Sequence, residues 1–152
     1  MLDVEIEGND LSRPAARLLK RVAKEHLEIL KQQGRELSIS LVSDRTIRKL
    51  NREHRGKDKA TDVLSFPQEE PKDALRATGP IGDVVISLHT AVRQADAGGW
   101  KVSLELKRLF AHGLLHCLGY DHETDADAKA MAAMEERVLG ARGMVGDSLT
   151  QR

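Results

Sequence analysis

Three histidines near the end of the sequence have the spacing of a metal site. The segment HGLLHCLGYDH places His112, His116 and His122 in the pattern H-x-x-x-H-x-x-G-x-x-H. Successive residues of a helix turn by about 100°, so the first two imidazoles lie on one face, one turn apart. Gly119 favours a helix end, because glycine readily takes the left-handed conformation, and the reversed chain can return His122 to the same point. We therefore predict one metal ion bound by these three imidazoles.

The donor atoms limit the choice of metal. Imidazole ligation suits Zn²⁺ and is also compatible with Ni²⁺, Cu²⁺ or Fe²⁺, and one Zn²⁺ ion is the default expectation. A structural zinc ion usually has a fourth protein ligand that completes its coordination. Cys117 is turned about 100° away from His116, so we expect it to be a small buried side chain instead. Asp121 can reach the ion or accept a proton from a ligand imidazole, and we favour the second role.

The same histidine spacing occurs in metzincin zinc proteases. Those enzymes need a glutamate directly after the first histidine as general base, and Gly113 stands at that position. A metal-dependent peptidase or amidase is therefore an alternative that we rank below a hydrolase acting on another substrate. Glycine inside a helix costs about 1 kcal/mol relative to alanine unless close packing compensates. We interpret Gly113 as leaving room for substrate beside the metal.

A basic segment lies in the middle of a chain whose overall formal charge is zero. Between positions 45 and 59 there are two acidic residues, Glu53 and Asp58, and seven basic ones, so the local charge is about +5. The basic residues are Arg45, Arg48, Lys49, Arg52, Arg55, Lys57 and Lys59. Such a segment usually forms a solvated helix face. Beside a metal it would instead hold phosphates, which guanidinium groups match well. With no global positive field, any binding of nucleic acid must use a local patch of this kind.

Hydrophobic periodicity predicts the elements that position these residues. Asp44 can cap the second helix, and the strand over 83–88 should be interior, because apolar residues occupy both of its faces for much of its length. The helix that carries the first two histidines is nearly apolar all round towards its end, so it should be central and buried. We expect one α+β domain over residues 1–152, with strands over 2–8, 37–43, 62–66 and 83–88, and helices over 9–34, 44–54, 88–95, 102–118 and from 124 onwards.

Two further features concern the connections and the compartment. The stretch from Gln68 to Pro80 has two prolines and no clear period, and it is either a lid or substrate loop or a surface excursion. No stretch near residue 1 combines a basic region with an apolar one, so we expect no leader peptide. No apolar run approaches roughly 20 residues, and Cys117 is the single cysteine. We expect a cytoplasmic protein that does not enter a membrane.

Taken together, these motifs resemble the YbeY family of bacterial rRNA maturation factors, which are metal-dependent endoribonucleases. The resemblance rests on LNREHRGKDKATDVLSFP (Leu50 to Pro67), IGDVVIS (Ile81 to Ser87) and HGLLHCLGYDH (His112 to His122). It implies an α+β fold in which a small mixed four-stranded sheet packs with about five helices. One departure is His54, where a tyrosine commonly precedes the arginine, and it affects local packing or a base contact.

The resemblance also implies an activity and its partners. Family members cut single-stranded RNA in rRNA 3′-end maturation and ribosome quality control, with zinc on the residues matched here by His112, His116 and His122. Their arginine, matched by Arg55, acts in catalysis with the first histidine of the motif, matched by His112. Expected partners are rRNA and the small ribosomal subunit, with an Era-type GTPase as a further one.

The residues leave the chemistry partly open. No residue beside the histidines is a convincing general base, and a neighbouring ribose 2′-hydroxyl is an alternative nucleophile to metal-bound water. An RNA-binding ribosome assembly factor with a mainly structural zinc uses the same residues and is the main alternative from another class.

Overall fold

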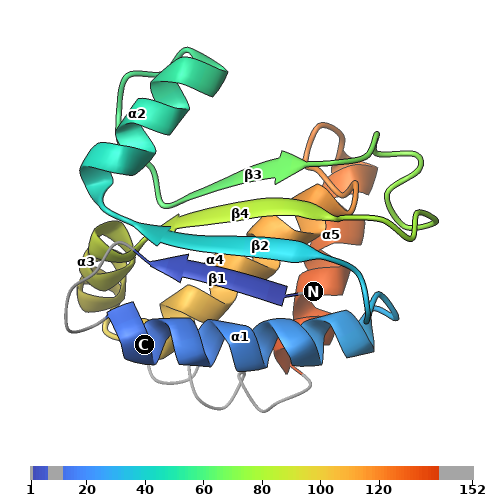
Figure 1. The fold of residues 1–152 in the computed structure, drawn as a ribbon, viewed down its shortest axis with the longest axis horizontal. Helices are drawn as coiled ribbons and strands as arrows, with labels where there is room; N and C mark the ends of the chain where they lie inside the picture. Colours follow the sequence, from blue (N-terminus) through green and yellow to red (C-terminus); the bar gives the residue numbers. More distant parts are fainter. Residues whose placement is uncertain (1, 7–11, 141–152) are drawn as a thin grey trace.

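The computed structural model describes residues 2–6 and 12–140 (Figure 1). Its four strands form one mixed sheet in the order β1-β2-β4-β3. The first three strands in that order run parallel, and the edge strand β3 pairs antiparallel with β4. The strands are β1 (Leu2–Ile6), β2 (Leu37–Val42), β3 (Val63–Pro67) and β4 (Gly82–Ser87).

Five helices accompany the sheet within the described ranges, so the predicted α+β class with a mixed four-stranded sheet is confirmed. Figure 1 shows α1 and α4 against one face of the sheet, while α2 projects beyond it. No helix of the described residues is long and apolar enough to span a bilayer. The helices are α1 (Ser12–Ile29), α2 (Asp44–Arg55), α3 (Leu88–Gly98), α4 (Val102–Cys117) and α5 (Asp125–Gly140).

Strand β4 is interior, as its apolar run predicted, and its side chains separate two cores. Because side chains alternate across a strand, Val84 and Ile86 pack into the main core with α1 and α4. Val85 instead joins Ile47 and Leu64 in a small cluster beneath α2. Helix α4 is buried over most of its length, which confirms the prediction of a central helix.

The start of α2 corrects one expectation. Ser43, not Asp44, is the N-cap, and its side chain accepts a backbone N–H of the first turn. The Asp44 carboxylate accepts the Ser87 and Thr90 hydroxyls at 2.6 Å each and pairs with Arg93 at 2.8 Å. Burial would raise the pKa of Asp44, but these hydrogen bonds and the charge of Arg93 lower it to about 2. Asp44 thus fastens α2 to α3.

Two element boundaries also differ from expectation. Helix α1 ends at Ile29, five residues before Gly34, because Lys31 takes a left-handed conformation with φ of 58°. The expected helix start at Asn9 and the expected strand end at Gly8 lie outside the described residues, as do both termini of the predicted domain.

The stretch from Gln68 to Pro80 is held against the body of the protein. The Arg35 side chain, 6% exposed, donates to the carbonyls of Ala74 at 2.6 Å and Gly79 at 2.8 Å. Ala74 is itself fully buried. Burial lowers the pKa of Arg35, but a guanidinium stays charged at neutral pH. The loop is therefore a packed surface segment with its own anchor.

Candidate metal centre

Helix α4 brings the first two histidines together. The Nε2 atoms of His112 and His116 lie 3.1 Å apart, and the ring centroids are 4.6 Å apart. His122 follows after the helix, with its ring centroid 5.0 Å from each of the other two. One nitrogen from each ring lies within 4.8 Å of the others, so the three side chains can hold a metal ion. This is the juxtaposition that the spacing predicted.

The turn that returns His122 depends on Gly119. This residue has φ of 100°, a conformation that side-chain-bearing residues rarely adopt. A Cβ atom here would also lie 2.6 Å from the Pro71 carbonyl oxygen. The loop that Arg35 anchors therefore supports the turn between the second and third histidines. The loop itself does not line the cavity that contains the histidines.

A carboxylate from α5 contacts the first histidine. Glu135 Oε2 lies 3.2 Å from His112 Nδ1, which leaves Nε2 directed at the other imidazoles. Their hydrogen bond lowers the pKa of Glu135. Asp121, expected in this role, accepts the backbone N–H of Glu123 at 3.1 Å. The sequence signal for Glu135 is its place one turn after the buried Met131.

The surroundings of the middle histidine, His116, disfavour its protonated form. Burial lowers the pKa of His116, and the positive charge of protonated His112 and His122 would lower it further. The charge of Arg55 acts in the same direction on that pKa. Because a metal ligand must be deprotonated, this environment favours metal binding near neutral pH.

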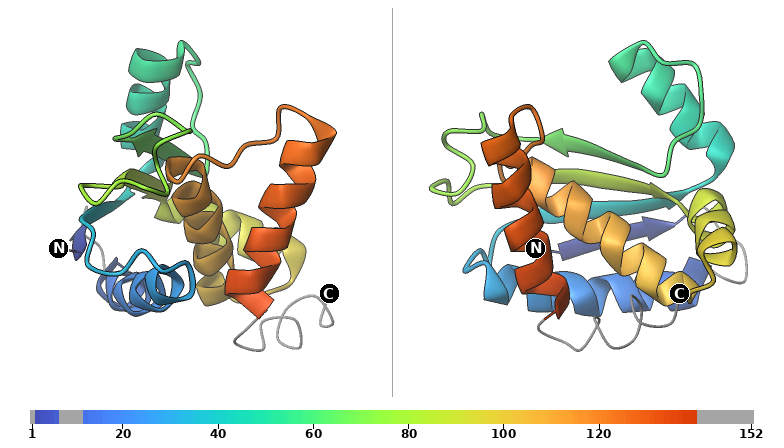
Figure 2. Two further views of the ribbon diagram at one scale, coloured as in Figure 1. Left: turned by 90° about the vertical axis from the view of Figure 1, so that its right-hand side faces the viewer. Right: turned by 180° about the vertical axis from the view of Figure 1, so that it is seen from behind.

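A cavity of about 960 Å³ contains the three histidines. Arg55 and Glu135 also line it, so the arginine and histidine implied by the resemblance face one space. The left view of Figure 2 shows α4 with α5 on one side and β3 with α2 on the other. His54 does not line this cavity, and its ring packs edge-on against Phe66 at 5.0 Å. The ring at position 54 therefore contributes to local packing.

Comparison with known proteins identifies the family. A family model described as Endoribonuclease YbeY matches residues 3–143. The chain belongs to the YbeY family. The Endoribonuclease YbeY of Myxococcus xanthus is 57% identical over 137 residues, which cover 90% of this chain and 47% of that protein. This chain therefore spans about half the length of that relative.

Two further comparisons agree. The Endoribonuclease YbeY of Anaeromyxobacter dehalogenans is 54% identical, over 95% of this chain and 73% of that protein. The solution structure of TM1509 from Thermotoga maritima is 27% identical with a TM-score of 0.61, and the match covers 100% of this chain and 99% of that one. The resemblance stated from the motifs is thereby confirmed.

In this YbeY-family chain, Gly113 serves packing, which corrects our interpretation that it leaves room for substrate. A Cβ atom at 113 would lie 2.7 Å from Val84 Cγ1 and 3.1 Å from Val63 Cγ2. The Gly113 carbonyl also accepts a hydrogen bond from the Ser65 hydroxyl at 3.0 Å. Position 113 faces the sheet, so the fold has no space there for the glutamate of a metzincin.

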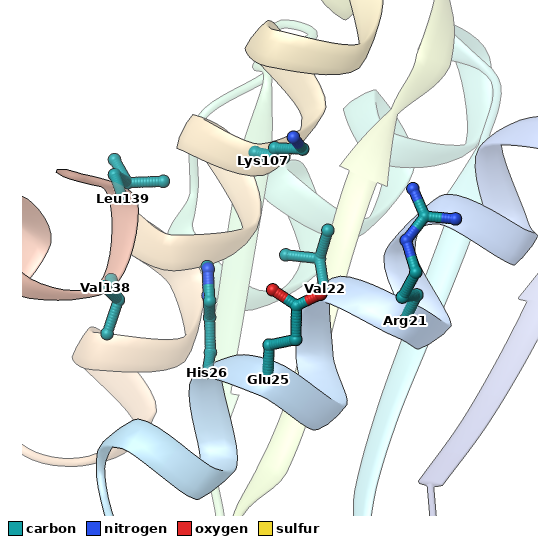
Figure 3. A pocket seen from close by; sticks show the side chains of 7 residues that line it. All are labelled: Arg21, Val22, Glu25, His26, Lys107, Val138 and Leu139. Carbon is teal, nitrogen blue, oxygen red and sulfur yellow. The ribbon is translucent and has the colours of Figure 1, made fainter. Parts of the chain in front are cut away.

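A second cavity, of about 260 Å³, lies where α1, α4 and α5 meet (Figure 3). Its lining includes His26, which is 3% exposed and stacks on Phe110 with ring centroids 5.6 Å apart. Burial, with a smaller effect of Lys107, lowers the pKa of His26 to about 4. His26 is thus a neutral core residue, and the YbeY motifs do not include it.

Proposed function

We propose that this chain is a metal-dependent endoribonuclease that cuts single-stranded RNA in rRNA 3′-end maturation and ribosome quality control. The observation that carries the proposal is one cavity shared by His112, His116, His122 and Arg55 in a chain of the YbeY family. Its partners are then rRNA and the small ribosomal subunit, with an Era-type GTPase as a further one. A cytoplasmic location follows from those partners.

The three imidazoles fit one Zn²⁺ ion. Their nitrogens converge within 4.8 Å, and Glu135 occupies Nδ1 of His112, so that Nε2 is the atom left to bind metal. A carboxylate on the far nitrogen of a ligand imidazole is the usual second contact of a zinc site. A bound zinc would supply Lewis acidity, by lowering the pKa of bound water or polarising a phosphoryl oxygen.

Arg55 is the residue proposed to act on the phosphate. It ends α2, where Gly56 takes a left-handed conformation and turns the chain away. Arg48 and Arg52 are both paired with Asp58, at 2.9 Å and 3.6 Å. Among the residues that the structure describes, Arg55 makes no ion pair, so its guanidinium is available to offset charge on a phosphate beside His112.

The size of the cavity supports a single strand as substrate. A volume of 960 Å³ is at the upper end of pockets for small organic ligands, which run from about 300 to 1,000 Å³. A short segment of a single strand fits such a space, whereas a double helix is too wide to enter it. A strand whose bases are unpaired can also leave the helical path to reach the floor of the cavity.

Three variants test the assignment with a defined single-stranded rRNA precursor fragment. We expect His116→Ala to lose zinc and cleavage, and Arg55→Glu to retain zinc and fold but lose cleavage. Arg17→Glu makes the same charge change at an exposed position of α1 outside the cavity and outside the basic segment, and it should cleave like wild type. Full cleavage by purified Arg55→Glu protein would contradict the role of the arginine.

The ends of the products distinguish the two nucleophiles. Attack by water leaves linear phosphate ends, whereas attack by the neighbouring 2′-hydroxyl forms a cyclic 2′,3′-phosphate. An RNA with a single 2′-deoxy sugar at the cut site provides the control, because it blocks only the second route. Binding of RNA without cleavage by any preparation would favour the assembly factor with a structural zinc.

A further inference from the structure

The cavity extends beyond the histidines along α4. Arg108, His112 and His116 follow one another at intervals of four residues and therefore lie on one face of the helix. Each interval advances about 6 Å along the helix axis. Arg108 and Leu109 line the same cavity as the histidines, together with Gln94 and Glu105. Besides Arg55, the cavity thus has a second arginine, Arg108, one helical turn away from His112.

The surroundings of Arg108 form a built site. Its guanidinium lies over the Trp100 ring, with Cζ 5.0 Å from the ring centroid. Nη1 lies 3.5 Å from Glu105 Oε1 but makes no hydrogen bond within the described part of the chain, although this atom is buried. The side chain as a whole is 40% exposed. Arg108 is therefore fixed in position, and the exposed part of its side chain is accessible from the cavity.

Glu105 is committed to other donors. The side chain is 5% exposed, and its two oxygens accept Trp100 Nε1 at 2.8 Å and Gln94 Nε2 at 2.6 Å. The Gln94 amide also donates to Asp62 at 3.3 Å, which fastens α3 to the start of β3. Glu105 thus holds the Trp100 ring in place under the guanidinium and neutralises Arg108 only in part.

We propose that Arg108, held on Trp100, binds the phosphate that adjoins the cut phosphate of a single-stranded RNA. The inference rests on the proposed function and deepens it. Guanidinium groups suit phosphate oxygens because their N–H groups form a planar fork, and stacking on an aromatic ring fixes that fork at little entropic cost. The step of about 6 Å from Arg108 to His112 is similar to the separation of successive phosphates in an extended strand.

Trp100 makes the site directly observable, because it is the single tryptophan of the chain. The zinc-loaded protein is titrated with 2′-O-methyl dinucleotides that carry no terminal phosphate, a 5′-phosphate or a 3′-phosphate. We expect a change in Trp100 fluorescence, and roughly tenfold tighter binding when a phosphate is added at one of the two ends. Arg108→Gln should abolish that gain and leave the affinity for the unphosphorylated dinucleotide unchanged.

Two variants keep the result interpretable. Arg17→Gln removes an arginine from an exposed position of α1, outside the cavity, and should behave like wild type. Arg108→Lys keeps a cation beside Glu105, and it tests the phosphate subsite if Arg108→Gln does not fold. It should retain part of the gain, because the charge remains while the fork is lost.

Steady-state cleavage of a longer RNA provides the second measurement. Arg108→Gln should raise KM roughly tenfold with kcat within twofold of wild type and zinc content unchanged. Equal gains from the terminal phosphate in wild type and in both Arg108 variants would overturn the subsite. So would an unchanged KM. Failure of wild type to cut RNA would refute the proposed function, whereas the dinucleotide titration does not depend on cleavage.

Discussion

Substitution of Gly113 by alanine tests how α4 is seated on the sheet. Alanine gains about 1 kcal/mol of helix propensity over glycine, so an unpacked site would be stabilised. Here the new methyl group would lie 2.7 Å from Val84 Cγ1 and 3.1 Å from Val63 Cγ2. Overpacking of a core costs about 1–3 kcal/mol. Both neighbours are β-branched and stiff, so we expect an overpacking cost of about 3 kcal/mol. After the gain in helix propensity, the unfolding free energy should fall by about 2 kcal/mol.

Urea unfolding of the Gly113→Ala protein measures this loss, and a double-mutant cycle with Val84→Ala assigns it to the contact. In the Val84→Ala background the alanine should be neutral or stabilising, a coupling of about 2–3 kcal/mol. Ala133→Gly at an exposed position of α5 calibrates helix propensity and should cost about 1 kcal/mol. A single Gly113→Ala protein more stable than wild type would refute the packing role and restore the interpretation of space beside the metal.

Three more predictions concern Glu135, His26 and Asp44. Glu135→Gln should weaken zinc binding roughly tenfold in a chelator competition, with the fold intact, since His112 loses its carboxylate; unchanged affinity would count against that contact. The pKa of His26 is lowered from 6.5 to about 4, so its stability contribution is complete above pH 6.5 and is lost as pH falls towards 4. Unfolding free energy should drop by about 2 kcal/mol from pH 7.5 to pH 5 through this group, and a drop of equal size in His26→Leu would contradict the assignment. The pKa of Asp44 is lowered from 3.8 to about 2, so Asp44→Asn should lower the unfolding free energy by about 2 kcal/mol at pH 7. This difference should disappear as pH falls from 3.8 towards 2, and a loss independent of pH would point to another cause.

The histidine cluster was predictable because its geometry is local. His112 and His116 lie one turn apart on one helix, and Gly119 starts the turn that returns His122. Each of these relations follows from helical geometry and from the conformational freedom of glycine. The four strands and five helices were likewise predictable from periodicity, and β4 was placed in the interior because apolar residues occupy both of its faces.

The features that the sequence did not reveal depend on how elements dock. Glu135 meets His112 across a separation of 23 residues, and only the register of α5 on α4 selects it over Asp121. The role of Gly113 is equally a property of the contact between α4 and the sheet. Ser43 and Asp44 are both acceptable caps by residue type, and the docking of α3 draws the Asp44 carboxylate away. Local propensity cannot rank such alternatives.

Cleavage of a defined ribosomal RNA precursor, with removal and return of zinc, tests the central claim most directly. Wild-type protein should lose cleavage after chelation and regain it when zinc is restored. The Arg55→Glu protein, prepared in the same way and shown to bind zinc, should not cleave in either state. Equal cleavage by chelated and zinc-loaded wild-type protein, or full cleavage by Arg55→Glu, would contradict a metal-dependent endoribonuclease built on the histidines and Arg55.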